Sequence, residues 1–189
     1  TDVMRDDKGR IYIDKNGKVY RNNNVGDVKL GSVFPKANMA WRNDFSYKGF
    51  NLSVMVSARF GGIVYSATQA ALDLYGVSEA SAKARDKGYV EVNGNDRLNP
   101  ESWYSTIGGS DGIPQFYTYS ATNVRLQEAS LSYTFKKNHF FGLGDLTLSV
   151  TGRNLLMFYC KAPFDPETTA TTGNYYQGID KFMTPSTRN

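Results

Sequence analysis

The residues that could perform acid–base or metal chemistry are few in this sequence of 189 residues. His139 is the single histidine and sits in the polar run KKNHFF, which argues against a histidine-based metal site or a catalytic triad. Asp165 and Glu167 flank Pro166, a pattern that predicts a turn rather than two catalytic carboxylates. Cys160 has no second cysteine to pair with and is interpreted as a small filler at a strand end. The sequence therefore predicts a protein that is not an enzyme and has neither a metal site nor a cofactor.

Aromatic residues offer a different chemistry, because ring faces stack on sugars and tyrosine hydroxyls orient polar ligands. The chain contains 13 Tyr and 11 Phe, and many of them lie in two long segments rich in turn residues, 61–121 and 159–185. Seven of these are the candidate substrate- or partner-binding residues: Tyr75, Trp103, Tyr104, Tyr117, Tyr119, Tyr175 and Tyr176. The alternative interpretation is that these side chains pack the segments together.

Four stretches alternate between apolar and polar residues and predict long β-strands with one apolar and one polar face: 37–47, 51–60, 123–135 and 145–158. The first two are joined by the sequence YKGF, which predicts a tight turn with Gly49 at positive φ. Gly152 and Asn154 interrupt the apolar face of the last stretch, which indicates either a β-bulge or the edge of a membrane.

Shorter elements are predicted elsewhere. Residues 66–76 and 78–88 have helix-forming composition, and each run ends at a glycine. Residues 11–20, IYIDKNGKVY, predict a β-hairpin around Asn16-Gly17. The oxygen-rich runs 14–17 and 93–99 lack the ligand spacing of an EF-hand and are interpreted as turns.

The connections between the long strands alternate between short (48–49, 136–144) and long (61–121, 159–185), as is typical of outer-membrane barrels. We therefore divide the chain into an outer loop and hairpin (1–36), a strand hairpin (37–60), a long outer loop (61–121), a second strand hairpin (122–158), an outer loop (159–185) and the start of a truncated strand (186–189). No apolar run reaches the ~20 residues of a membrane helix, whereas a barrel strand needs only about 9–11. The net charge of +4 is scattered along the chain, so nucleic acid is not an expected partner.

Five sequence pieces, in this order, resemble the C-terminal barrel region of the SusC/RagA-like TonB-dependent transporters of Bacteroidetes. They are NDFSYKGFNLSVMVSARFGGIVYSAT (43–68), ATNVRLQEASLSYTF (121–135), LSVTGRNLLMF (148–158), FDPE (164–167) and YYQGIDKFMTPSTR (175–188). The resemblance spans most of the chain from about residue 26 onward. Each piece alone is a modest signal, and the specificity lies in their order and spacing.

The resemblance implies an all-β fold, namely an antiparallel transmembrane β-barrel of the 22-stranded class with a plug inside it. This chain would supply C-terminal strands of that barrel together with long extracellular loops that contain short helices. The implied function is import of oligosaccharides or peptides across the bacterial outer membrane. The implied partners are a SusD-like surface lipoprotein that acts as a lid, the TonB complex through an N-terminal part outside this chain, and membrane lipid. We expect this chain to be part of a longer protein.

A soluble β-sandwich that binds carbohydrate is the alternative, since alternating strands and aromatic loops also suit that architecture. The two hypotheses differ in what covers the apolar strand faces. In a barrel these faces meet lipid, and in a sandwich they meet a second sheet.

Overall fold

The computed structural model describes residues 2–26, 28–136, 144–167 and 177–182. The chain divides into two compact units. The loop unit comprises residues 1–31, 64–119 and 169–183, and the sheet unit comprises residues 32–63, 120–168 and 184–189. His139, Tyr175 and Tyr176 lie outside the described residues, as does most of the connection 136–144.

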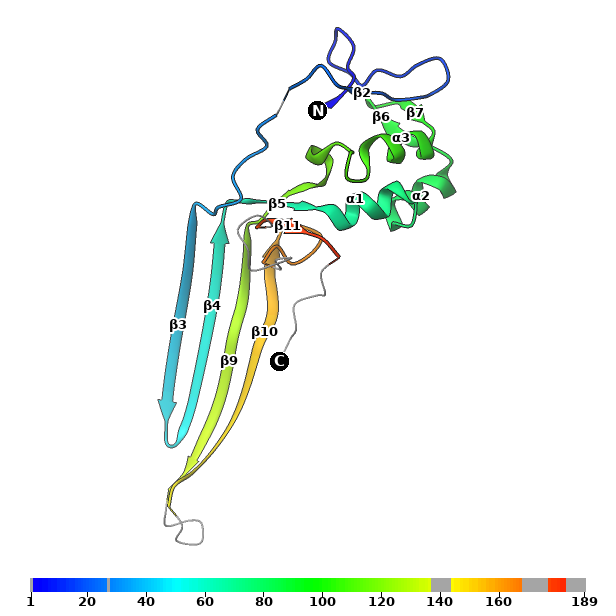
Figure 1. The fold of residues 1–189 in the computed structure, drawn as a ribbon. Coiled ribbons are helices and arrows are strands. Elements are labelled where there is room, and N and C mark those ends of the chain that lie inside the picture. Colours follow the sequence, from blue (N-terminus) through cyan, green and yellow to red (C-terminus); the bar gives the residue numbers. More distant parts are fainter. Residues whose placement is uncertain (1, 27, 137–143, 168–176, 183–189) are drawn as a thin grey trace. The chain divides into compact units, whose positions relative to one another are not determined.

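The sheet unit is built from four long antiparallel strands in the order β10-β9-β4-β3, which lie side by side in Figure 1. Their bounds follow the alternation of the sequence closely: β3 Ala37–Tyr47, β4 Phe50–Phe60, β9 Asn123–Phe135 and β10 Leu146–Cys160. The shortest of these strands have 11 residues, which matches the ~9–11 that cross a bilayer. Among the described residues the sheet stays open, because β3 and β10 each pair on one side only.

The turn between β3 and β4 consists of Lys48 and Gly49, which have φ values of 46° and 90°. Positive φ at both central positions is the hairpin geometry whose twist matches that of the strands. The register pairs Tyr47 with Phe50 directly across this turn. The backbone amide of Thr134 in β9 donates a hydrogen bond to the Gly49 carbonyl oxygen at 2.9 Å, so the turn is also tied to the next strand.

The polar face of the sheet is held together by hydrogen bonds between side chains of neighbouring strands. The hydroxyls of Ser130 and Thr151 lie 2.9 Å apart, and those of Thr134 and Thr147 lie 3.0 Å apart. On the opposite face large apolar residues remain exposed, among them Trp41 at 63% and Val150 at 78% of the full accessible surface of the residue. Each strand thus presents two chemically different faces.

A β-bulge interrupts β10 between Arg153 and Leu156, where the pairing with β9 shifts register. Asn154 adopts φ = 50° at this bulge, a conformation that Asn tolerates better than most residues. A Cβ atom on Gly152 would lie 2.6 Å from a methyl carbon of Leu155, so a larger residue there would require the Leu155 side chain to move. Of the two interpretations of Gly152 and Asn154, the bulge is confirmed.

The loop unit combines short helices with small sheets. The helices are α1 Ala67–Leu74, α2 Glu79–Lys87, α3 Pro100–Ile107 and the 3₁₀-helix η1 Pro114–Tyr117. The strands pair as β1 Asp2–Val3 with β2 Arg21–Asn22, β6 Val90–Val92 with β7 Asp96–Leu98, and β11 Ile179–Asp180 with β5 Ile63–Ser66 and then β8 Thr118–Ser120. Buried residues from α1, α3, η1, β6, β7 and the N-terminal segment form one apolar core. Among the described residues, no helix has the length and apolar character needed to cross a membrane.

Side-chain caps explain where the helices begin. The hydroxyls of Ser66 and Ser78 accept hydrogen bonds from backbone amides in the first turns of α1 and α2, as is usual for N-caps. Gly88 ends α2 in the left-handed conformation at φ = 82°. The helices predicted over 66–76 and 78–88 are therefore confirmed. Helix α3 was not predicted, because its segment reads as turn-rich.

The β-hairpin predicted over residues 11–20 is present only as an isolated antiparallel bridge between Ile13 and Val19, without named strands on either side. At its tip the Asp14 carboxylate accepts hydrogen bonds from the backbone amides of Asn16 and Lys18, at 2.9 and 2.7 Å. The bond from the Lys18 amide is the main reason that the pKa of Asp14 lies below its usual value. The Asp14 carboxylate therefore stabilises the turn, and the interpretation of residues 14–17 as a turn is confirmed.

Replacing Gly49 with alanine is expected to impair strand pairing, because the added Cβ would sit 3.0 Å from the Thr134 carbonyl oxygen. Gly94 is a matched control, since it has the same φ of 90° but no atom within 4 Å of an added Cβ. Both substitutions introduce a backbone strain of about 1–3 kcal/mol. Only Gly49→Ala also adds the close contact with the Thr134 carbonyl oxygen. Heat-modifiable gel mobility of the full-length protein would report assembly. Equal yields for the two variants would show that the contact with β9 is unimportant.

Candidate functional site

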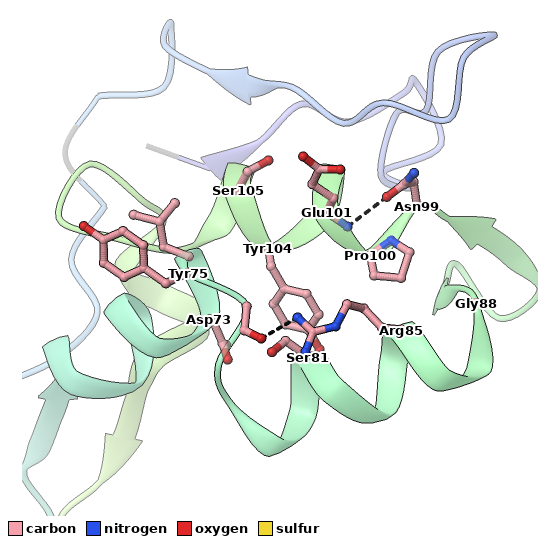
Figure 2. Close-up of a pocket in the computed structure, with 12 residues that line it drawn as sticks. Asp73, Tyr75, Ser81, Arg85, Gly88, Asn99, Pro100, Glu101, Tyr104 and Ser105 are labelled. Atoms are coloured by element: carbon pink, nitrogen blue, oxygen red, sulfur yellow. Dashed lines mark hydrogen bonds between the residues drawn. The ribbon is translucent and has the colours of Figure 1, made fainter.

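The loop unit contains a cavity of about 530 Å³ between the ends of α1, α2 and α3. Figure 2 shows its polar and aromatic lining. The residues that contribute most of the chemistry are Asp73, Tyr75, Arg85, Asn99, Glu101 and Tyr104. All of them belong to the segment that the sequence analysis assigns to the long outer loop.

The connection between α1 and α2 forms one wall of this cavity. Helix α1 ends at Tyr75, and Gly76 follows at φ = 67°. The Arg85 guanidinium donates a hydrogen bond to the Gly76 carbonyl oxygen, which ties α2 to the end of α1 (Figure 2). A Cβ on residue 76 would lie 2.6 Å from an Arg85 nitrogen, so glycine at this position leaves room for the Arg85 guanidinium.

The opposite wall is the first turn of α3. The Asn99 side-chain oxygen accepts a hydrogen bond from the Glu101 backbone amide at 2.8 Å, and Pro100 occupies the first helical position. This arrangement is a favourable helix start, because proline has no amide hydrogen to leave unsatisfied there. It places the Glu101 carboxylate and, one turn later, the Tyr104 ring at the cavity.

Asp73 is the most deeply buried charged group of the site, with 5% of its surface exposed. Its carboxylate accepts a hydrogen bond from the Gln69 side-chain amide at 2.9 Å. Burial, followed by the negative charge of Asp73, raises the pKa of Tyr104, Tyr117 and Tyr119 above the usual tyrosine value. The Tyr117 hydroxyl lies close to this carboxylate but makes no hydrogen bond of standard geometry to any described residue. The charge of Asp73 thus acts on three neutral tyrosines, of which Tyr104 lines the cavity.

The cavity can hold a polar ligand. The Asp73 and Glu101 carboxylates accept hydrogen bonds, the Arg85 and Asn99 side chains supply donors, and the Tyr75 and Tyr104 rings offer apolar faces. No group of three metal-ligating side chains occurs within the described part of the chain. The lining is therefore suited to hydrogen bonding and stacking.

The structure brings together only some of the aromatic residues singled out from the sequence. Tyr75, which is 77% exposed, and the half-buried Tyr104 line the cavity. Tyr117 is fully buried in the core, and Tyr119 lies half-buried in β8. Tyr175 and Tyr176 fall outside the described residues. Ligand or partner binding by these residues stays a prediction.

Trp103 faces the core of the loop unit rather than the cavity. It is 8% exposed, and its ring meets the Phe116 ring edge-on with 5.4 Å between centroids. Consecutive residues of a helix point about 100° apart, so Trp103 and Tyr104 of α3 face different surroundings. The structure gives Trp103 a packing role and leaves Tyr104 as the member of that pair with access to a ligand.

The sequence analysis missed Asp73, Arg85, Asn99 and Glu101. A local signal existed for two of them, because Asn99-Pro100-Glu101 is a recognisable helix start. No local signal marks Asp73 and Arg85, whose roles depend on how α1, α2 and α3 pack.

The different burial of Trp103 and Tyr75 gives a direct test of this assignment. Trp103→Ala is expected to destabilise the loop unit by about 3–5 kcal/mol, because it leaves a large cavity in the core. Tyr75→Ala removes an exposed ring and serves as the control, with an expected change within about 0.5 kcal/mol. Limited proteolysis of the full-length protein would show faster cleavage within 64–119 only for the first variant. Equal cleavage of both would contradict the packing role of Trp103.

Comparisons with known proteins show what this chain is similar to. No protein-family model matches the sequence. The chain is 26% identical over 202 residues to TonB-dependent receptor P3 of Formosa agariphila, a match that covers 97% of this chain and 18% of the receptor. Its fold matches a chain in the structure of the RagAB peptide importer in the open-open state with a TM-score of 0.60 and 17% identity, covering 93% of this chain and 20% of that one. The chain thus spans about a fifth of the length of either relative. The similarity expected from the sequence is confirmed: this chain resembles part of a SusC/RagA-like TonB-dependent transporter.

Proposed function

We propose that this chain is part of an outer-membrane TonB-dependent importer and contributes four strands to its transmembrane β-barrel. The observation that carries the proposal is the exposed apolar face of the four-stranded sheet. Large apolar side chains line that face on all four strands: Met39, Trp41, Phe45, Leu52, Leu131, Leu148 and Val150. A contiguous surface of this kind is unfavourable in water and favourable against lipid.

The distribution of aromatic residues on this face supports the proposal. At the end of the sheet that carries the 48–49 turn, the rings of Phe50 and Tyr133 lie 4.4 Å apart and those of Tyr133 and Phe135 lie 4.6 Å apart. Exposed Tyr47 lies at the same end, and exposed Phe60 and Tyr159 lie at the other. Barrels place such aromatic girdles at the two membrane interfaces.

The open edges of β3 and β10 support a larger closed assembly. Within the described residues each of these strands has one row of backbone groups without a strand partner. In lipid such groups must be paired, which only further strands of a closed barrel provide. A 22-stranded barrel with an internal plug, as in the SusC/RagA-like transporters, satisfies this requirement.

The proposed cargo is an oligosaccharide or a peptide, captured together with a SusD-like surface lipoprotein, and the energy comes through TonB. Two observations support this reading. The relatives are named a TonB-dependent receptor and a peptide importer rather than enzymes. The loop unit offers a cavity whose carboxylates and tyrosines suit polar cargo. In this arrangement the segments 1–36, 61–121 and 159–185 lie outside the cell, and the 48–49 turn lies on the periplasmic side.

A charge on the apolar face should block membrane assembly. Val54→Arg in the full-length protein places a guanidinium near the middle of β4, where lipid exposure costs about 2–4 kcal/mol. Ser53→Arg is the matched control, because the neighbouring residue faces the polar side, where Asp44 lies across the strand pair. The measurement is the amount of heat-modifiable protein in purified outer membranes. Normal assembly of Val54→Arg would favour the soluble sandwich.

The outer position of the cavity predicts a loss of binding when its rings are removed. Replacing Tyr75 and Tyr104 by alanine in the intact transporter should weaken cargo or partner binding by about 2 kcal/mol, roughly thirtyfold in affinity. The experiment follows uptake of labelled oligosaccharides and oligopeptides and recovery of the lipoprotein on purification. Lys48→Ala, in the turn on the periplasmic side, should change neither. Unchanged uptake and recovery in the double variant would remove this cavity from the binding surface.

A further inference from the structure

The chain that leaves β10 turns back onto the polar face of the sheet. We call residues 161–167 the strap. Ala162 and Pro166 of the strap are buried, although the segment lies beyond the last strand. The Cys160 thiol at the end of β10 lies 3.3 Å from the Ala162 carbonyl oxygen and 3.6 Å from that of Phe164. The strap therefore covers this thiol.

A buried ion pair fastens the strap to the sheet. The Arg125 guanidinium in β9 donates two hydrogen bonds to the Asp165 carboxylate, at 3.0 and 2.7 Å. Side-chain exposure is 5% for Arg125 and 12% for Asp165. A third nitrogen of Arg125 donates to the Asn123 side-chain oxygen at 3.3 Å. Two-pronged pairing of this kind fixes both distance and orientation.

The second carboxylate of the strap belongs to Glu167 and also borders a recess on the polar face of the sheet. Glu167 lies 3.4 Å from Arg125 and also lines a recess of about 500 Å³. The sheet side of this recess is formed by Asn38, Ser57, Arg59 and Gln127. The Glu167 carboxylate of the strap thus shares this recess with the positively charged Arg59 of the wall, an arrangement that screens solutes by size and charge in channels.

We propose that the strap is an inward-folded constriction of the channel and that Arg125 is the positioning residue that latches it. This inference rests on the proposed function, in which the polar face lines the lumen of the barrel. The constriction lies at the end of the sheet where β4 and β10 end and β9 begins, opposite the 48–49 turn. Cargo that passes this end of the lumen meets Glu167 on the strap and Arg59 on the wall.

The Cys160 thiol reports whether the strap is latched. In detergent-solubilised full-length protein with other cysteines replaced, Asp165→Asn should speed the reaction of Cys160 with a small maleimide by about tenfold or more, because it removes the two-pronged carboxylate partner of buried Arg125 and leaves only the more distant Glu167. Glu128→Gln is the matched control, since it breaks an exposed ion pair with Arg153 on the same polar face. Arg125→Met is a second variant and should also accelerate labelling. Heat-modifiable mobility selects assembled protein for each measurement, and unchanged rates in both latch variants would overturn the latch.

A second cysteine tests the constriction itself. With Cys160 replaced by serine, Ser57→Cys places a thiol in the recess, and Ser132→Cys places one on the same face near the 48–49 turn. A maleimide carrying a long polyethylene glycol chain should label Ser57→Cys only when Asp165→Asn is also present, and should label Ser132→Cys equally with and without it. Equal labelling of Ser57→Cys in both backgrounds would overturn the constriction. These outcomes are separate from a failure of the barrel, which shows as normal assembly of Val54→Arg.

Discussion

The separation of apolar and polar residues onto the two faces of one sheet is the constraint on which the rest of this structure depends. Side chains of successive strand residues point to opposite sides, so a strict alternation gives each strand two different surfaces. Here both surfaces are exposed, with Trp41 and Val150 on one and Ser130 and Thr151 on the other. Such a sheet needs a different environment on each face. The proposed barrel would provide lipid on one side and a water-filled lumen on the other.

The loop unit is stabilised in a different way, by an enclosed apolar core. Leu98, Trp103, Ile113 and Tyr117 are buried together there. Around this core, α1, α2 and α3 begin at side-chain caps, and a glycine lies at or just after the end of each helix. The three helices are therefore short. A polar cavity lies beside this core, and of its lining residues Tyr104 also packs against the core. The exposed residues of the lining, such as Tyr75 and Glu101, can therefore vary while the unit keeps its fold.

The parts predictable from the sequence are those encoded locally. The period of two marks the long strands, the dipeptide Lys48-Gly49 marks the tight turn, and glycines mark the ends of α1 and α2. The β6–β7 hairpin escaped prediction because three residues per strand are too few to show a period. The pair of Arg125 and Asp165 escaped for another reason. Its members are 40 residues apart, and only the fold brings them together.

Residues 64–119 of the loop unit are inserted between β4 and β9, and this has a consequence for how such proteins diversify. Its entry strand β5 and exit strand β8 are neighbours in one sheet, and just beyond them the Ala121 amide donates to the Gly62 carbonyl oxygen at 3.0 Å. The first and last residues of this long insertion therefore lie as close together as the ends of a short turn. Closing a long loop costs conformational entropy. The folding of the insertion offsets that cost. Strands β4 and β9 of the sheet are joined to the insertion through this hydrogen-bonded stem. Selection can then lengthen, shorten or exchange surface segments of the insertion without disturbing the four-stranded sheet.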